Sequence, residues 1–330
     1  MNINAKNSSP KVSVIITAYN HEKYIFESIS SVLNQSFQDF EIIVINDGSN
    51  DKTASIINDI VSEYPEKILF INNDKNIRPK FSCNQGISAA RGKFIAWNDG
   101  DDLWLPEKLE KQMKIFDMDH NNETHIVYSL GENIIENSKR IRNKFEGKLV
   151  EKNFFKEMFS SSFFLKNSMI VRKEVYENLG FLNEKYQLCG DYEYMIRMAA
   201  AGYKFKLVNE VLALHRIHEN NETTNRSIAI NNTKIMLMDV SKNYPNLIKK
   251  FKINVNDRLS VCDYQIARFF FAKKSYSKAK QICLEILKSN LGFLIRNKTF
   301  FYFFILCFLP EIIHHPLKNI RLLENIYKST

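Results

Sequence analysis

Short runs of β-branched and apolar residues alternate with amphipathic helical patterns from Val12 onward, and this alternation constrains the fold more than any other feature. Four runs stand out: Val12–Thr17, Glu41–Asn46, Ile68–Ile71 and Lys93–Asn98. The first, VSVIIT, has the composition of a strand covered on both faces. Because strands that alternate with helices are joined by right-handed crossovers, they form a parallel sheet. The sequence therefore predicts an α/β fold with a doubly wound, mostly parallel sheet.

Amphipathic helices are expected between these strands. Asn50 or Asp51 is placed to cap one of them, and Pro106 suits the first position of another. A further helix is predicted at Ser82–Ala90. The apolar residues of the helical patterns recur three and four residues apart: Ile25, Ile29, Val32 and Leu33; Ile56, Ile57, Ile60 and Val61; Leu109, Met113 and Phe116.

The middle of the chain, roughly residues 125–215, is less regular. It predicts strands at His125–Leu130, Met169–Arg172 and Phe205–Val208, and a helix at about Tyr192–Ala201. We interpret it as the second half of the same domain.

After about residue 230 the chain becomes helical and basic, and its apolar spacing predicts a single helical hairpin. A chain of 330 residues is long enough for one sizeable domain and a smaller appendage. We therefore divide it into a disordered leader over residues 1–10, a main domain over residues 11–225 and a C-terminal helical appendage over residues 226–330.

The formal net charge of +9 suits nucleic acid, an anionic membrane surface or a phosphorylated substrate, and composition does not rank these partners. The cysteines are widely spaced and odd in number, so we expect reduced thiols in a cytoplasmic protein: Cys83, Cys189, Cys262, Cys283 and Cys307. The polar start, MNINAKNSSPK, lacks the apolar core of a signal peptide.

Polar clusters follow three of the predicted strands. They are Thr17-Ala18-Tyr19-Asn20, Asn46-Asp47-Gly48 and Asn98-Asp99-Gly100-Asp101-Asp102. Ligands of open α/β sheets bind beyond the carboxyl ends of the strands. We therefore expect these three segments to meet at one crevice.

The DGDD sequence is the strongest chemical signal. Asp99 and Asp101, one residue apart in an extended turn, can hold a hard divalent cation such as Mg²⁺ or Mn²⁺, with water and substrate phosphate at its other positions. The alternative is a solvated acidic turn in which Asp101 or Asp102 caps the next helix.

Asp47 could accept a hydrogen bond from the N3–H of a uracil-like base, or it could only shape the Asp-Gly turn. Thr17 and Tyr19 could add a hydroxyl group and a stacking face to the same pocket, although Tyr19 could also simply pack.

Three segments in this order resemble the family 2 glycosyltransferases of the glycosyltransferase-A fold. They are PKVSVIITAYNHEKYIFESISSVLNQSFQDFEIIVINDGSNDKT, NQGISAARGKFIAWNDGDDLWLP and GDYEYMIRMAAAGYKF, and the resemblance covers about residues 10–220. It implies an inverting enzyme that moves a sugar from a nucleotide diphosphate donor, most simply a UDP-sugar, to an acceptor docked in the middle region. Residues 11–225 would then be the catalytic domain.

The resemblance also implies roles for particular residues. Thr17, Ala18, Tyr19 and Asp47 match the donor-nucleotide pocket. Asp99 and Asp101 match the family's DxD pair, with Asp101 the direct metal ligand and Asp99 nearer the ribose. Asp191 matches the general base, and His218 matches a histidine that approaches the metal or the diphosphate.

Each of these roles has a rival. Asp191 could instead cap the helix that follows it, and Glu193 is a second candidate base. His215 competes with His218, and Arg216 could contact the diphosphate. The chain also has Cys83 where many relatives have an arginine, so Lys80 or Arg78 would have to replace that donor contact.

The aromatic run Thr299–Leu309 is too short to span a bilayer, which takes ~20 apolar residues. It suggests peripheral contact with anionic headgroups, or else internal packing or a dimer contact; the aromatic residues are Phe300, Phe301, Phe303, Phe304 and Phe308. With such a contact, the family resemblance implies a saccharide or polyprenyl-linked acceptor in O-antigen or capsule polysaccharide biosynthesis at the inner face of the plasma membrane. No nucleic-acid partner is expected.

Two other classes remain open from the sequence. A sugar-nucleotide nucleotidyltransferase usually carries a glycine- and arginine-rich phosphate loop, which TAYNHEKY lacks. A non-catalytic nucleotide-sugar-binding scaffold would not need to retain Asp99, Asp101 and Asp191.

Overall fold

The computed structural model describes residues 9–135, 140–145, 153–161, 165–219, 221 and 226–308. The chain divides into two compact units, Met1–Asn221 and Glu222–Thr330. The predicted disordered leader, residues 1–10, lies outside the described residues except for Ser9 and Pro10.

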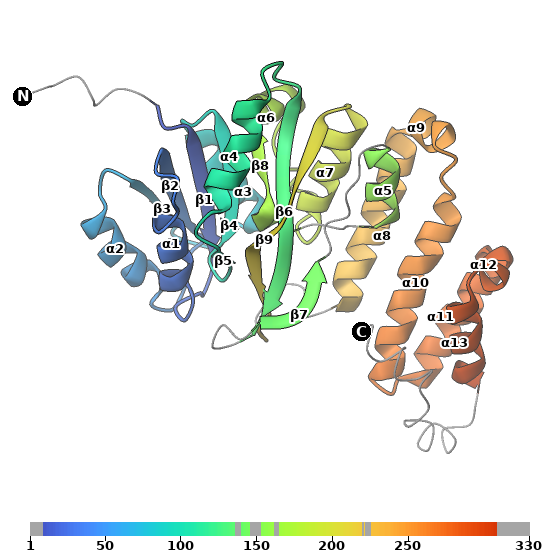
Figure 1. Ribbon diagram of the computed structural model, residues 1–330. Helices are drawn as coiled ribbons and strands as arrows, with labels where there is room; N and C mark the ends of the chain where they lie inside the picture. The colour runs from blue at the N-terminus through green and yellow to red at the C-terminus, as the bar shows by residue number, and fades with distance from the viewer. Residues whose placement is uncertain are drawn as a thin grey trace, which may run out of the picture. The chain divides into compact units, whose positions relative to one another are not determined.

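A nine-stranded sheet forms the first unit, with the strand order β3-β2-β1-β4-β8-β6-β9-β5 and with β7 paired to β6 (Figure 1). The strands β3, β2, β1 and β4 run parallel, as their alternation with helices predicts. The strands are β1 (Val12–Ala18), β2 (Phe40–Asn46), β3 (Ile68–Asn72), β4 (Phe94–Asp99), β5 (Leu103–Trp104), β6 (Thr124–Ile134), β7 (Arg140–Phe145), β8 (Ile170–Arg172) and β9 (Lys204–Arg216).

The second half of the sheet is mixed. β8 is antiparallel to both β4 and β6, and β5 is antiparallel to β9, whereas β6 and β9 run parallel. The α/β class is confirmed, and the sheet is mostly parallel as predicted: among the described strands β3, β2, β1, β4, β6 and β9 run in one direction, and β5, β7 and β8 run in the other.

Helices cover both faces of the parallel strands. Val12, Val14 and Ile16 pack in one core cluster with apolar residues of α1, α2 and α4. Ile15, which points to the opposite face because strand side chains alternate, contacts α3. The helices of this unit are α1 (Ile25–Leu33), α2 (Thr53–Glu63), α3 (Pro79–Ala89), α4 (Lys108–Met118), α5 (Phe154–Ser160), α6 (Lys173–Leu179), α7 (Gly190–Ala200) and the 3-10 helix η2 (Lys166–Ser168).

Two predicted helix starts are wrong in detail. Pro106 precedes α4 by two residues, because a turn closed by Lys108 N–H and the Leu105 carbonyl comes first. The N-cap position of α2 is Lys52, not Asn50 or Asp51, and the Lys52 side chain makes no capping hydrogen bond. Asp51 nevertheless accepts the N–H of Thr53, the first residue of the helix, at 2.9 Å.

Gly86 lets α3 lie close against the sheet. A β-carbon at this position would lie 2.5 Å from Ile15 Cγ2 on β1 and 3.0 Å from Ile45 Cδ1 on β2. Glycine is therefore required here for close packing of a helix on two strands.

The second unit is helical. The predicted hairpin is confirmed as α10 and α11, whose apolar faces share a core with α12 and α13. Among the described residues, no helix combines the length and apolar character needed to cross a membrane. The helices are α8 (Arg226–Asn243), α9 (Pro245–Lys250), α10 (Val255–Ala272), α11 (Tyr276–Ser289), α12 (Leu291–Arg296) and α13 (Lys298–Phe308).

The aromatic run forms α13 and has two different faces. Phe300 and Phe303 are fully buried, and both rings contact Tyr264 edge-on with centroids 5.3 Å apart. The prediction that these two residues enter a membrane interface is therefore wrong, because the unit needs them for its own core. Phe301 and Phe308 stay exposed, and Phe304 is partly buried.

We expect Gly86→Ala to destabilise the first unit by about 1–3 kcal/mol, the usual cost of forcing extra volume into a packed core. Urea unfolding would measure it. Ser88→Ala, on the exposed side of the same helix, is the matched control and should change stability by less than about 0.5 kcal/mol. Equal stability of the two variants would show that α3 can move away from the sheet freely.

Candidate active site

The three polar clusters meet at the carboxyl ends of β1, β2 and β4, as the sequence predicts. The Asp47 N–H donates to the Ala18 carbonyl at 2.8 Å, and the Gly100 N–H donates to the Thr17 carbonyl at 2.9 Å. The Thr17 hydroxyl also donates to Asp99 Oδ1 at 3.2 Å. Hydrogen bonds between the strand ends thus hold the three segments together.

Asp47 is buried and shapes the floor of this region. Its Oδ1 accepts the Ile77 N–H at 2.8 Å, which holds the segment before α3. The adjacent Gly48 has φ +69°, and a β-carbon there would lie 2.3 Å from the Lys75 carbonyl carbon. Tyr19, by contrast, is 40% exposed, so its ring is accessible for stacking.

Asp99 is paired with Lys166, which sequence reasoning missed. Lys166 Nζ lies 2.5 Å from Asp99 Oδ1 and 5.4 Å from the centre of the Trp97 ring. Burial alone would lower the pKa of Lys166, but Asp99 and its other acidic neighbours raise it well above its usual value. Lys166 lies in the irregular middle of the chain, where no motif singles it out.

Asp101 is the centre of a second cluster. Its Oδ2 lies 3.0 Å from His218 Nε2, 3.2 Å from Asn221 Nδ2 and 3.9 Å from His21 Nε2. Burial tends to raise the pKa of Asp101, but the His218 hydrogen bond and the nearby histidines bring it down to about 2. The carboxylate is therefore ionised at neutral pH.

Asp101, His218 and His21 are a group of possible metal ligands in the described part of the chain. One donor atom from each lies within 4.8 Å of the others. The predicted ligands Asp101 and His218 are thus brought together, whereas Asp99 is not in the group. His21 directly follows the first polar cluster, and that position was the signal that could have identified it.

Asp102, His215 and Arg216 form a buried framework behind this cluster. Asp102 accepts from the Arg216 N–H at 2.9 Å and from His215 Nδ1 at 3.1 Å. The Arg216 guanidinium donates to the Asp101 carbonyl at 2.9 Å and to Glu27 at 2.7 Å. The predicted contact of Arg216 with a diphosphate is therefore wrong, because these bonds hold a side chain that is almost fully buried.

Asp191 is the second residue of α7, whose N-cap is Cys189. Asp191 is therefore not at the N-cap position, although its carboxylate accepts hydrogen bonds from the backbone N–H groups of Asp191 and Tyr192. Lys80 Nζ lies 3.8 Å from Asp191 Oδ1. Burial tends to raise the pKa of Asp191, but the charges of Lys80 and Lys166 lower it overall. Because Lys166 also pairs with Asp99, Asp191 belongs electrostatically to the same site.

Glu193 is a poorer candidate for a base than Asp191. Its carboxylate pairs with Arg197 at 3.1 Å one turn along α7, and burial raises its pKa. Cys83 is buried beside Lys80 and Lys166, and its burial raises the thiol pKa. Lys80, proposed to replace a donor contact at Cys83, is itself buried against Asp191, whereas Arg78 is exposed.

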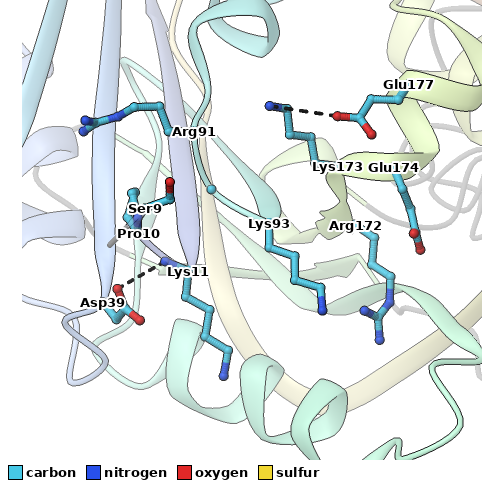
Figure 2. Close-up of a pocket in the computed structure, with 11 residues that line it drawn as sticks. Ser9, Pro10, Lys11, Asp39, Arg91, Lys93, Arg172, Lys173, Glu174 and Glu177 are labelled. Carbon is cyan, nitrogen blue, oxygen red and sulfur yellow. Dashed lines mark hydrogen bonds and ion pairs between the residues drawn. The ribbon is translucent and has the colours of Figure 1, made fainter. Parts of the chain in front are cut away.

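A separate basic pocket lies at the opposite ends of the parallel strands. Figure 2 shows Lys11, Lys93 and Arg172 around a cavity of about 500 Å³, with acidic side chains on the same walls. Lys11 precedes β1 and Lys93 precedes β4, so the pocket is remote from the carboxyl ends of these strands. Several of its charges are paired, as in Lys173–Glu177 at 4.0 Å.

The fold resembles that of solved glycosyltransferases. The mannosyltransferase PcManGT from Pyrobaculum calidifontis, solved with GDP-Man and Mn²⁺, has a TM-score of 0.56 and 14% identity, over 91% of this chain and 84% of that one. S. aureus TarS 1–349, solved with UDP, has a TM-score of 0.53 and 17% identity, over 87% and 92%. The chain spans 54% of a longer TarS structure. These likenesses establish a glycosyltransferase-A-type fold.

The family model for glycosyl transferase family 2 matches residues 13–180. An uncharacterized glycosyltransferase of Methanocaldococcus jannaschii is 37% identical over 216 residues, which are 63% of this chain and 71% of the relative. The chain belongs to glycosyltransferase family 2 and is a glycosyltransferase. This finding excludes the nucleotidyltransferase and the non-catalytic scaffold.

The His215–Asp102 pair predicts a pH-dependent part of the stability. Burial tends to lower the pKa of His215, but Asp102 raises it from 6.5 to about 9. Protonation of His215 therefore favours folding: the contribution is complete below about pH 6.5 and is lost as the pH rises through about 9. The imidazole side chain is 32% exposed, so solvent screens the ion pair. We therefore expect the free energy of unfolding to fall by on the order of 2 kcal/mol over this pH range.

Urea unfolding at pH 6.5 and 9.5 would measure this loss, with His215→Gln as the comparison. The variant lacks the titrating imidazole, so it should lose less stability between the two pH values. Parallel pH profiles for the wild type and the variant would contradict the assignment.

Proposed function

We propose that the protein is an inverting glycosyltransferase that uses a nucleotide diphosphate sugar, most simply a UDP-sugar, as donor. The observation that carries the proposal is that four aspartates converge on one end of the sheet: Asp47, Asp99, Asp101 and Asp191. Lys166 pairs with Asp99 and lowers the pKa of Asp191. In support, TarS has been solved with UDP-GlcNAc and with UDP.

The donor nucleotide would lie over the ends of β1, β2 and β4. Thr17, Ala18, Tyr19 and Asp47 line this region from two adjacent strand ends, with Asp47 toward the base and the exposed Tyr19 ring as a stacking face. Asp99 would lie toward the ribose. Asp99 is less suited to bind a cation directly, because its Oδ1 already pairs with the ammonium group of Lys166.

A divalent metal fits the Asp101 cluster. Asp101 offers an ionised carboxylate oxygen and His218 an imidazole nitrogen, and both donor types bind Mn²⁺. PcManGT was solved with Mn²⁺, which supports the same cofactor class here. A bound ion would neutralise the charge of the departing diphosphate. Mg²⁺ is the less suitable ion, since it prefers oxygen ligands throughout.

Asp191 is the proposed general base. Its lowered pKa keeps it ionised, and it accepts the proton of the acceptor hydroxyl as that oxygen attacks the anomeric carbon. The new glycosidic bond forms as the bond to the diphosphate breaks, so the configuration inverts in a single displacement. Lys80, 3.8 Å away, stabilises the charged form before the reaction.

The acceptor is proposed to be a saccharide or a polyprenyl-linked saccharide in surface polysaccharide biosynthesis, such as O-antigen or capsule, at the cytoplasmic face of the plasma membrane. The support comes from the outer face of α13. Phe301, Tyr302, Ile305 and Phe308 are 41–47% exposed, and Lys280 Nζ lies 4.3 Å from the centre of the Phe308 ring. An apolar face beside lysine suits peripheral contact with anionic lipid headgroups.

We expect Asp191→Asn to lower kcat for sugar transfer by about 10²–10⁴-fold, because it removes the base without changing the shape of the side chain. Asp101→Asn should lower activity by about 10²-fold, and excess chelator should abolish activity until Mn²⁺ is restored. UDP release measured with a panel of UDP-, GDP- and dTDP-sugars provides the readout and identifies the donor.

Glu193→Gln is the matched control for Asp191→Asn, since it alters a carboxylate two residues along the same helix. Its activity should stay within about threefold of wild type. Full activity of Asp191→Asn, or full activity in chelator, would reject the base or the metal respectively.

The membrane contact can be tested by flotation with vesicles of phosphatidylglycerol and phosphatidylcholine. The triple variant Phe301→Ser, Ile305→Ser and Phe308→Ser should float far less than wild type, because burial of each apolar side chain contributes about 1.5–3 kcal/mol. The control replaces two exposed apolar residues of the first unit, Leu69 and Met118, by serine. Equal flotation of the triple variant and wild type would contradict the contact.

A further inference from the structure

His21 is held at a fixed place between β1 and α1. Its N–H donates to Thr53 Oγ1 at 2.8 Å, and its carbonyl accepts the N–H groups of Tyr24 and Ile25, both at 2.9 Å. The preceding Asn20 has φ +56°, a left-handed turn that ends the strand segment. Three hydrogen bonds thus fix the backbone that carries the ring.

The ring itself points toward Asp101. Its Nε2 lies 3.9 Å from Asp101 Oδ2, and the side chain is only 18% exposed. In the part of the chain that the structure describes, its Nδ1 is buried and has no hydrogen-bond partner. Nδ1 lies against Gly100, so Nε2, the nitrogen that faces Asp101, is the one placed to bind a cation.

Gly100 makes this position of the ring possible. A β-carbon on Gly100 would lie 2.7 Å from His21 Nδ1, 2.9 Å from Ala18 Cβ and 3.1 Å from the Thr17 carbonyl oxygen. The glycine of the DGDD sequence therefore has a steric role beyond the turn: it leaves the space in which His21 packs against the acidic loop.

His218 contacts the same oxygen of Asp101, with its Nε2 3.0 Å from Oδ2. The two histidine rings lie edge to face with centroids 6.3 Å apart, and the His218 ring packs 4.8 Å from the ring of Tyr24. Two imidazoles from segments nearly 200 residues apart in the chain thus face one carboxylate, and all three donor atoms lie within 4.8 Å of one another. Asp99, which the motif had suggested as the other ligand, is paired with Lys166 instead.

We propose that His21 is the third protein ligand of the divalent cation, in the role that the sequence pattern assigned to Asp99. The protein then offers one carboxylate and two imidazoles and leaves further positions for water and the donor diphosphate. This donor set favours a transition metal such as Mn²⁺ over Mg²⁺, because Mg²⁺ strongly prefers oxygen. The inference rests on the proposed function in requiring a metal at this site, and it adds a third protein ligand to Asp101 and His218.

Mn²⁺ titration of the full chain, followed by electron paramagnetic resonance with and without UDP, tests the ligand directly. We expect His21→Ala and His218→Ala each to raise the Kd for Mn²⁺ by at least about 10-fold. Electron spin echo spectra should show two imidazole nitrogen couplings in wild type and one in either variant. The surface control His120→Ala should leave both Kd and couplings unchanged, and Asp99→Asn should keep both imidazole couplings in the absence of UDP.

Gly100→Ala provides a second variant that keeps the imidazole but displaces it, and it should also weaken Mn²⁺ binding. Circular dichroism and Tm verify that each variant is folded. Unchanged Mn²⁺ binding by His21→Ala, one or no imidazole coupling in wild type, or failure of wild type to bind Mn²⁺ at millimolar concentration would overturn the proposal.

The same samples separate this inference from the proposed function. If wild type binds Mn²⁺ through two imidazoles but releases no nucleotide diphosphate from any donor sugar, the ligand assignment stands and the proposed function fails. If transfer requires Mn²⁺ but His21→Ala binds the ion as wild type does, the function stands and the assignment of His21 is wrong.

Discussion

The register of the three central parallel strands is the constraint on which the rest of the site depends. Pairing of β1 with β2 and β4 sets Ala18 opposite Asn46 and Thr17 opposite Asp99. Because parallel strands end at the same edge, the loops that follow them begin side by side. A slip of one residue in either pair would turn the strand side chains to the opposite face and separate these loops.

The acidic groups gathered at this edge are tolerated because each has its own partners. Asp99 has Lys166, Asp101 has two histidines, Asp102 has the framework of His215 and Arg216, and Asp191 has Lys80. A buried carboxylate without such partners would shift its pKa and become neutral. The partners come from segments distant in the chain, so the charge balance of the site is a property of the whole first unit.

The prediction was most accurate where local pattern and tertiary structure agree. The runs VSVIIT and EIIVIN are strands because both faces are covered, and a continuous apolar run records that directly. It was weakest for very short elements and for apolar residues that can be either buried or exposed. β5 has only two residues and was not predicted, and α13 is apolar all round, so its sequence does not distinguish the buried Phe303 from the exposed Phe301.

By itself, the sequence determined the class of fold, the edge of the sheet at which polar loops gather and the identity of the acidic residues there. These follow from periodicity and from order along the chain, which are local properties. Only the tertiary structure decided which of those residues act together. It pairs Lys166 with Asp99, buries Arg216 in the framework, and places His21 and His218 beside Asp101. The physical reason is that a short-range contact between distant segments depends on how helices and strands pack, and no spacing in the sequence records it.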